Sequence, residues 1–293
     1  MREAHDDEAA VARELAALSV AEIVDAAGAR GAPRIARRLV SMLATVPSAR
    51  LGSSLARFDA DVASVGIGGA ARALLRRFGA AVDVHGSVPP RGAALVVTNH
   101  PGAYDSIAMM AAVARDDVAI VAAERAFLSA MPRFRRHLVF VTDSREKDSV
   151  MGRMAGLRRA LAWLESGKVL VQYGAGAIEP DARFARPGAD ILGTWSSGTG
   201  VLAAYAAERG AAIVPALVSG VHSRRAMAVP GVRWAERRGV TTIAPLIQAT
   251  MPGFRDVRIG VRFGEPVDRA ALLATKTPAA RTAMLRGAVS SLA

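Results

Sequence analysis

The stretch AALVVTNHPGAYD, residues 93–105, determines how the rest of the chain is interpreted. Its first half is apolar and rich in β-branched residues, which is typical of a buried strand. Pro101 and Gly102 then predict a sharp reversal, and the following YDSIAMMAAVAR has the spacing of a helix. His100 and Asp105 are therefore expected in a turn between a strand and a helix. Open α/β sheets bind their ligands at that edge.

Short β-branched runs recur on both sides of this stretch and alternate with helical patterns. Besides AALVVTN, we predict strands in AAVDVHG, VAIVAA, HLVFVTD, KVLVQY, AAIVPALVSG and DVRIGVRFG. This alternation predicts an α/β fold with a largely parallel central sheet flanked by helices. Residues 8 to about 80 instead repeat apolar side chains at helical spacing. We therefore expect a helical N-terminal region, 1–80, followed by an α/β domain, 81–293.

The composition excludes several classes of function. The 293 residues are 52% hydrophobic and can bury a large core. The absence of cysteine rules out disulfides, thiolate zinc sites and cysteine nucleophiles, and five scattered histidines do not predict a metal site. The net charge of +12 is compatible with nucleic acid, an anionic membrane surface or phosphate-bearing substrates. Aromatic residues, at 5%, are too sparse for a single-strand stacking platform, and only the net charge supports nucleic-acid binding, so no nucleic-acid partner is expected.

Membrane contact is predicted to be peripheral. The N-terminal MREAHDDEAAVAREL lacks the apolar run of a signal peptide, and no window reaches the roughly 18 uninterrupted apolar residues of a spanning helix. We therefore expect a cytoplasmic protein. The amphipathic PRIARRLVSMLATV and the arginine-rich residues 133–137 are candidates for contact with anionic lipid. The alternative, in which these segments pack on a core and leave their arginines in water, is commoner and stays open.

His100 and Asp105 have the chemistry of a general base. A carboxylate bonded to one imidazole nitrogen fixes the tautomer and leaves the other nitrogen free to take a proton from an attacking hydroxyl. No nucleophilic side chain is then needed. A loop histidine followed by an ordinary first-turn aspartate, stabilised by the helix dipole, gives the same pattern. The motif alone leaves both interpretations open.

Three further blocks change this balance. Together with residues 99–105 they resemble the phospholipid/glycerol acyltransferase family, in which an N-H-x-x-x-x-D block follows a buried strand. The segments that resemble the second, third and fourth family blocks are HLVFVTDSR at 137–145, KVLVQYGAGAIEP at 168–180 and AAIVPALVSG at 211–220. The resemblance covers roughly residues 82 to 266.

The third block departs from the family pattern. Tyr173, Gly174 and Ala175 stand where the family has Phe, Pro and Glu, so the carboxylate that contacts the acceptor is missing from its usual place. Gly176 is kept. Branches of the family with a Gly-Gly turn have a Glu three residues later, and Glu179 falls at that spacing. Glu179 is therefore our candidate for the replacement.

The resemblance implies transfer of a fatty acyl group from acyl-CoA or acyl carrier protein to a hydroxyl of a lysophospholipid or related glycerolipid. It implies His100 as the general base, Asp105 as its partner, and no cofactor beyond the acyl thioester. It also places the protein at the inner face of the cell membrane. The residues that we expect to bind substrate are Asn99, Arg145, Gly176, Glu179 and Arg183.

Two other interpretations of the resemblance remain. Ala175 in place of the family's Glu favours an acceptor without phosphate, such as a neutral glycerolipid or an amino-acid lipid. A catalytically silent relative that only binds lipid or membrane is the second.

Two segments resemble motifs of other protein classes but lack the surrounding structure or spacing that those motifs require. GIGGAA at 66–71 follows no clear strand, as a dinucleotide-binding turn requires, and SSGTG at 196–200 lacks the spacing of a serine-hydrolase elbow.

Overall fold

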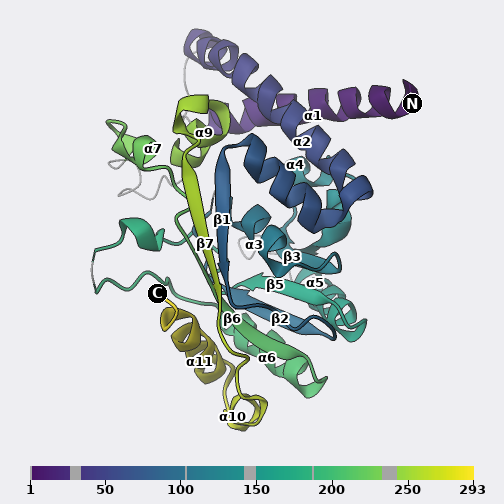
Figure 1. Ribbon diagram of the computed structural model, residues 1–293, viewed down its shortest axis with the longest axis vertical. Coiled ribbons are helices and arrows are strands. Elements are labelled where there is room, and N and C mark those ends of the chain that lie inside the picture. The colour runs from purple at the N-terminus through teal and green to yellow at the C-terminus, as the bar shows by residue number, and fades with distance from the viewer. Residues whose placement is uncertain (1, 27–33, 103, 142–149, 187, 233–242) are drawn as a thin grey trace. The chain divides into compact units, whose positions relative to one another are not determined.

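The computed structural model describes residues 2–26, 34–102, 104–141, 150–186, 188–232 and 243–293 (Figure 1). Contacts divide the chain into two compact units. One unit consists of Met1–Ala81, Arg125–Arg135 and His222–Val257, and the other of Val82–Glu124, Arg136–Val221 and Arg258–Ala293. The division into a helical region at 1–80 and an α/β domain at 81–293 stays a prediction.

A seven-stranded sheet in the order β1-β7-β6-β2-β5-β3-β4 organises the chain. Its strands are β1 (Ala80–His85), β2 (Ala94–Thr98), β3 (Val118–Ala123), β4 (Leu138–Val141), β5 (Val169–Tyr173), β6 (Ala212–Ser219) and β7 (Val257–Phe263). β2 pairs in parallel with β5 and β6, β3 pairs in parallel with β4 and β5, and β7 runs antiparallel to β6. The predicted α/β class and all seven predicted strands are confirmed.

The helices of the sheet-containing unit lie on both faces. They are α3 (Asp105–Val113), α5 (Val150–Glu165), α6 (Ser197–Glu208), α10 (Arg269–Ala274) and α11 (Pro278–Ser290), with the 3₁₀ turns η2 (Phe134–His137) and η3 (Ala182–Phe184). The chain moves in one direction across the sheet from β2 to β3 and in the other from β5 to β6. Because parallel crossovers are right-handed, α3 and α6 cover opposite faces (Figure 1).

The core of this unit lies between the sheet and the helices α5, α6 and α11, which cover one face of it. β2 is buried at every position because it has parallel neighbours on both edges and helices on both faces. Its inward side chains Leu95 and Val97 belong to a cluster with Leu170 of β5, Leu202 of α6 and Leu285 of α11. The end of β2 is thus a rigid base for the residues that follow it.

Helices dominate the other unit, which comprises α1 (Arg2–Ala26), α2 (Arg34–Arg77), α4 (Ala126–Ser129), α7 (Arg224–Ala228), α9 (Ile243–Thr250) and the turn η4 (Pro252–Phe254). Residues 34–46 of the predicted amphipathic segment, and the predicted helical pattern up to residue 77, fall in α2, in which the non-helical Gly66 (φ 71°) separates two helical segments. GIGGAA therefore lies at this kink and at the start of the helical segment after it, and a helix rather than a strand precedes it. The buried carboxylate of Asp59 accepts hydrogen bonds from the backbone N–H groups of Arg133 and Phe134.

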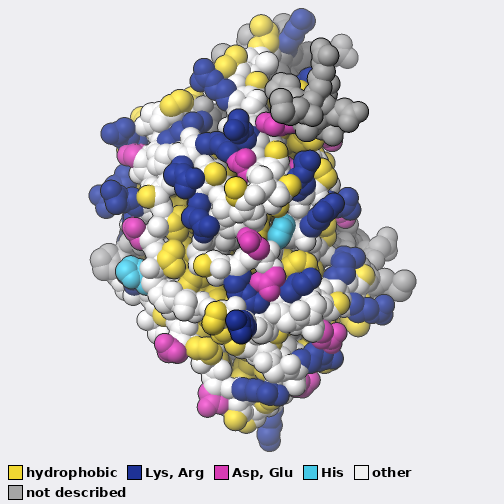
Figure 2. Space-filling model, turned by 45° about the vertical axis from the view of Figure 1, so that its right-hand side comes forward, with side chains coloured by type: hydrophobic (Ala, Val, Ile, Leu, Met, Phe, Trp, Pro, Cys, Tyr) yellow, Lys and Arg dark blue, Asp and Glu magenta, His cyan; other side chains and the backbone are white. Residues whose placement is uncertain are grey.

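Basic side chains are spread over the face seen in Figure 2, with acidic and apolar side chains between them. In the arginine-rich segment 133–137, Arg133 pairs with Asp59 and Phe134 is buried, while Arg135 and Arg136 are exposed. Within the described residues, no helix combines the length and apolar character needed to cross a membrane.

The contact of α6 with α11 gives a test of the fold. A Cβ added at Gly200 of α6 would lie 2.2 Å from the carbonyl oxygen of Pro278. We expect Gly200→Ala to lower the free energy of unfolding by about 1–3 kcal/mol because the helices must separate. Gly287→Ala on α11, where a Cβ meets nothing within 4 Å, should be neutral or stabilising by up to about 1 kcal/mol. Urea unfolding followed by circular dichroism measures both, and equal midpoints would contradict the close approach.

Candidate active site

The candidate site lies where the chain reverses its direction across the sheet. β2 and β5 are neighbours, with Thr98 opposite Tyr173, but the helix after β2 and the helix after β5 lie on opposite faces. Their carboxyl ends therefore separate into a topological switch point, which is the common ligand-binding position in open α/β sheets. His100 follows β2 there, and Tyr173 ends β5.

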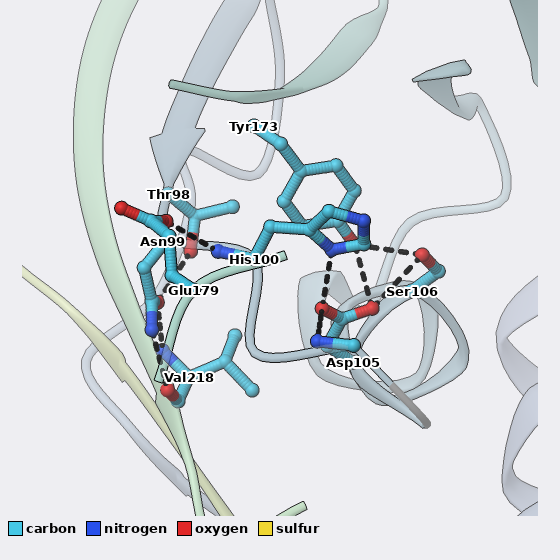
Figure 3. Close-up of polar contacts among 9 residues, drawn as sticks. Thr98, Asn99, His100, Asp105, Ser106, Tyr173, Glu179 and Val218 are labelled. Atoms are coloured by element: carbon cyan, nitrogen blue, oxygen red, sulfur yellow. Dashed lines mark hydrogen bonds and ion pairs between the residues drawn. The ribbon is translucent and has the colours of Figure 1, made fainter. Parts of the chain in front are cut away.

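Asn99 extends the pairing between β2 and β6 beyond the end of the strand. Its side-chain amide donates to the carbonyl oxygen of Val218 at 2.9 Å and accepts from the Val218 N–H at 2.8 Å (Figure 3). The residue is fully buried. The structure thus places the predicted substrate-binding Asn99 against the backbone of β6, where its amide replaces a missing rung of the ladder.

Glu179 holds the backbone of His100. The N–H of His100 donates to Oε2 of Glu179 at 2.8 Å, and the N–H of Glu179 donates to the carbonyl oxygen of His100 at 2.7 Å. The other carboxylate oxygen accepts from the N–H of Gly193 at 2.7 Å and from Nε1 of Trp195 at 3.0 Å. The structure therefore brings Glu179 to His100, as a buried carboxylate directed at backbone and indole donors.

The side chains of His100 and Asp105 form a hydrogen-bonded pair. Nδ1 of the imidazole lies 2.7 Å from Oδ2 of Asp105, and the same oxygen accepts from the N–H of Gly102 at 2.8 Å. Gly102 has φ +80°, a conformation that favours glycine and that turns its N–H back onto the carboxylate. Asp105 is buried, whereas 26% of the His100 side chain is exposed. Nε2 has no protein partner in the part of the chain that the structure describes.

Tyr173 and Ser106 complete the surroundings of the pair, and neither was predicted from the sequence as a site residue. Oδ1 of Asp105 lies 3.1 Å from the Ser106 hydroxyl and 3.3 Å from the Tyr173 hydroxyl. The phenol ring also stacks on the imidazole, with ring centroids 4.2 Å apart and planes at 28° (Figure 3). The signal in the sequence was the Tyr that replaces the Phe of the family block.

Burial and charge act in opposite directions on His100. Burial disfavours the imidazolium and alone would lower the pKa of His100, but the negative charge and hydrogen bond of Asp105, together with the charge of Glu179, outweigh it. The pKa of His100 is therefore raised above its ordinary value. Burial next to Asp105 also raises the pKa of Tyr173 well above that of a free phenol, so this hydroxyl stays protonated at neutral pH.

Of the other three residues predicted to bind substrate, the two that the structure describes make no hydrogen bond to the pair of His100 and Asp105. Gly176 is exposed at the turn after β5, with φ +62° and open space where a Cβ would point. Arg183 is exposed; its guanidinium donates to the carbonyl oxygen of Arg258 at 2.8 Å and lies against Gly220 at the carboxyl end of β6. Arg145 lies outside the described residues. The described part of the chain contains no cluster of three His, Asp or Glu side chains able to hold a metal ion.

These features define an α/β protein with a His–Asp pair at the carboxyl edge of its sheet. Residues 81–219 match the protein-family model described as Acyltransferase, so this segment is an acyltransferase domain. Among solved structures, the chain is similar to the 1-acyl-sn-glycerophosphate (LPA) acyltransferase PlsC from Thermotoga maritima. The identity is 17%, the alignment covers 83% of this chain and 81% of that one, and the TM-score is 0.48. A search of curated proteins found no match.

The opposing influences on His100 predict how its titration responds to Asp105→Asn. Removing the negative charge leaves burial, the largest influence, opposed mainly by Glu179, so the pKa of His100 should fall below its ordinary value. NMR titration of labelled histidine, assigned with His100→Ala, measures this change. Asp117→Asn, which removes a carboxylate paired with Arg115, is the control and should leave the His100 resonance as it was. An unchanged pKa in Asp105→Asn would show that the carboxylate does not stabilise the imidazolium.

The contacts of Glu179 predict that Glu179→Gln lowers the stability of the protein as well as the rate of acyl transfer. A glutamine cannot accept at both ends, so either His100 or the pair Gly193 and Trp195 loses a buried acceptor. The cost is about 1–3 kcal/mol of unfolding free energy. The matched control is Glu165→Gln, an exposed carboxylate paired with Arg209, which should change stability little. A rise in KM for the acceptor at unchanged stability would instead support the acceptor-binding role expected from sequence.

Proposed function

We propose that this acyltransferase moves a fatty acyl group from acyl-CoA or acyl carrier protein to a hydroxyl of a lysophospholipid or related glycerolipid. The observation that supports it is the pair of His100 and Asp105 at 2.7 Å, with Nε2 left without a protein partner among the described residues. The supporting context is the acyltransferase match over residues 81–219. No cofactor or metal is part of the proposal.

In the proposed mechanism, Nδ1–H of His100 donates to Asp105, which leaves the lone pair of Nε2 for the acceptor hydroxyl. As the acceptor oxygen bonds to the thioester carbonyl carbon, its proton passes to Nε2. The tetrahedral intermediate then breaks its C–S bond, and the leaving thiolate takes the proton from Nε2–H. Asp105 stabilises the imidazolium that exists between these steps. General acid–base help of this kind contributes roughly 100- to 10,000-fold in rate.

Two features bear on the acceptor. Arg183 is exposed at the carboxyl end of β6, on the same edge of the sheet as the residues after β2, and its guanidinium suits a phosphate group. On the other hand, Ala175 supplies no carboxylate at the turn and Glu179 is occupied by backbone and indole donors. Because the carboxylate that contacts the acceptor in the family is absent, the alternative acceptor is one without phosphate, either a neutral glycerolipid or an amino-acid lipid. We propose that the enzyme meets these lipids peripherally, at the anionic inner face of the cell membrane.

An acyl-transfer assay tests the proposal. The wild-type protein is given long-chain acyl-CoA or acyl carrier protein with a panel of lysophospholipid, neutral glycerolipid and amino-acid-lipid acceptors. Thiol release and product masses are measured. We expect acceptor-dependent release that falls at least about 100-fold in His100→Ala. The matched control His85→Ala changes an exposed histidine of β1 and should keep the wild-type rate.

The acceptor panel also separates the alternatives. If Arg183 binds a phosphate, Arg183→Ala raises KM for lysophospholipids and leaves neutral acceptors unaffected. Acylation of neutral acceptors alone, with no effect of Arg183→Ala, would select the acceptor without phosphate. Absence of thiol release with every donor and acceptor, at unchanged vesicle binding in His100→Ala, would refute the proposal in favour of a silent lipid-binding protein.

A further inference from the structure

Two hydroxyl groups meet Oδ1 of Asp105, the carboxylate oxygen that does not bond His100. The hydroxyls of Ser106 and Tyr173 are 2.8 Å apart, and they lie 3.1 Å and 3.3 Å from Oδ1 of Asp105. Ser106 belongs to the first turn of α3, and Tyr173 is the last residue of β5. The catalytic carboxylate is therefore linked to the neighbouring strand through side chains as well as through the backbone.

The number of hydrogen atoms limits how these three contacts are made. With Asp105 ionised, the two hydroxyls carry two hydrogens, so only two of the three contacts are hydrogen bonds at one time. The shortest contact joins the two hydroxyls, and one hydrogen must lie there because two oxygens 2.8 Å apart without a hydrogen repel each other. The remaining hydrogen belongs to the contact with Asp105.

The distances favour one order of donors and acceptors among the three oxygen atoms. Ser106 is closer to Asp105 than Tyr173 is, at 3.1 Å against 3.3 Å. A phenol is also a better donor than an aliphatic hydroxyl, and burial keeps Tyr173 protonated. The arrangement that fits is Tyr173 donating to Ser106 and Ser106 donating to Asp105. A hydroxyl that accepts a hydrogen bond donates more strongly, so the two bonds reinforce each other.

We propose that Tyr173 and Ser106 form a serial hydroxyl relay that fixes Oδ1 of Asp105 and thereby aims Oδ2 at the imidazole of His100. The inference rests on the proposed role of His100 as the base. Tyr173 and Ser106 are positioning residues, because they act on His100 through Asp105. The Tyr173 ring adds a second restraint, since it stacks on the imidazole and limits its rotation.

Two conservative variants separate the hydroxyls from the ring. Tyr173→Phe keeps the stacked ring and removes only the first donor, whereas Ser106→Ala removes the donor that touches Asp105. Each should lower kcat roughly three- to tenfold, a fraction of the whole general-base contribution, with KM for donor and acceptor within about twofold of wild type. Tyr205→Phe, an exposed tyrosine of α6, is the matched control and should keep the wild-type kcat.

The double variant tests the serial order. Once Ser106 lacks its hydroxyl, Tyr173 retains only the long 3.3 Å contact with Asp105, so Tyr173→Phe/Ser106→Ala should be about as slow as Ser106→Ala alone. Losses that multiply would show two independent donors and overturn the relay. Wild-type kcat in both single variants would overturn it as well.

The titration of His100 gives a measurement that does not depend on turnover. The titratable groups that face this ring, among the described residues, are Asp105 from α3, Tyr173 from β5 and Glu179 from the segment after β5. A carboxylate attracts the imidazolium more strongly when it has lost a donor, as in Ser106→Ala, or when its donor is weakened, as in Tyr173→Phe. The NMR titration of His100, and the acid limb of kcat/KM, should therefore move to higher pH in Tyr173→Phe and Ser106→Ala, but not in Tyr205→Phe.

The two proposals fail in different ways. If His100→Ala keeps the wild-type rate, the proposed general base is wrong whatever the titrations show. If His100→Ala is inactive while the titration and kcat of Tyr173→Phe and Ser106→Ala match wild type, the general base stands and the relay is wrong.

Discussion

The hydrogen bonds that hold the backbone immediately after β2 are the constraint on which the site depends. β2 ends between two parallel neighbours, so the peptide groups beyond it have lost their strand partners on both sides. Asn99 supplies the missing partner toward β6, and Glu179 supplies it at His100. A general base must be held within a fraction of an ångström of its working position. These bonds fix the backbone of His100 independently of the contacts of its side chain.

The carboxylates that position His100, those of Glu179 and Asp105, also act on its charge. Glu179 is buried with three donors on its carboxylate, which stabilises its negative charge, and that charge also favours the imidazolium of His100. Asp105 is likewise fixed by the N–H of Gly102 and by its place in the first turn of α3, where the helix dipole favours an anion. The carboxylates that shape the loop therefore also set the proton affinity of the base.

Local patterns in the sequence predicted most of this framework. Seven strands followed from β-branched runs, and the pairing of His100 with Asp105 followed from a reversal at Pro101 and Gly102. The orientation of Glu179 and the hydroxyl contacts of Tyr173 could not be predicted, because they depend on packing between β2 and β5. The sequence also did not predict that the first helical segment of α2 runs through Pro47 to the kink at Gly66, because this length depends on packing against α1, where Gly52 lies close to Ala12 and Ala16.

The balance of forces on His100 explains why a partly exposed ring suits the proposed reaction. In the proposed reaction, a lipid acceptor bound at the site would cover the exposed quarter of the imidazole and exclude water. The cost of burying an imidazolium then rises, but the attraction of Asp105 also strengthens in the lower dielectric. The neutral ring of the ground state gains little from that attraction, whereas the imidazolium formed as the proton transfers gains all of it. Stabilisation that is realised only along the reaction raises kcat, and here it depends on a carboxylate that is already fixed before the substrate arrives.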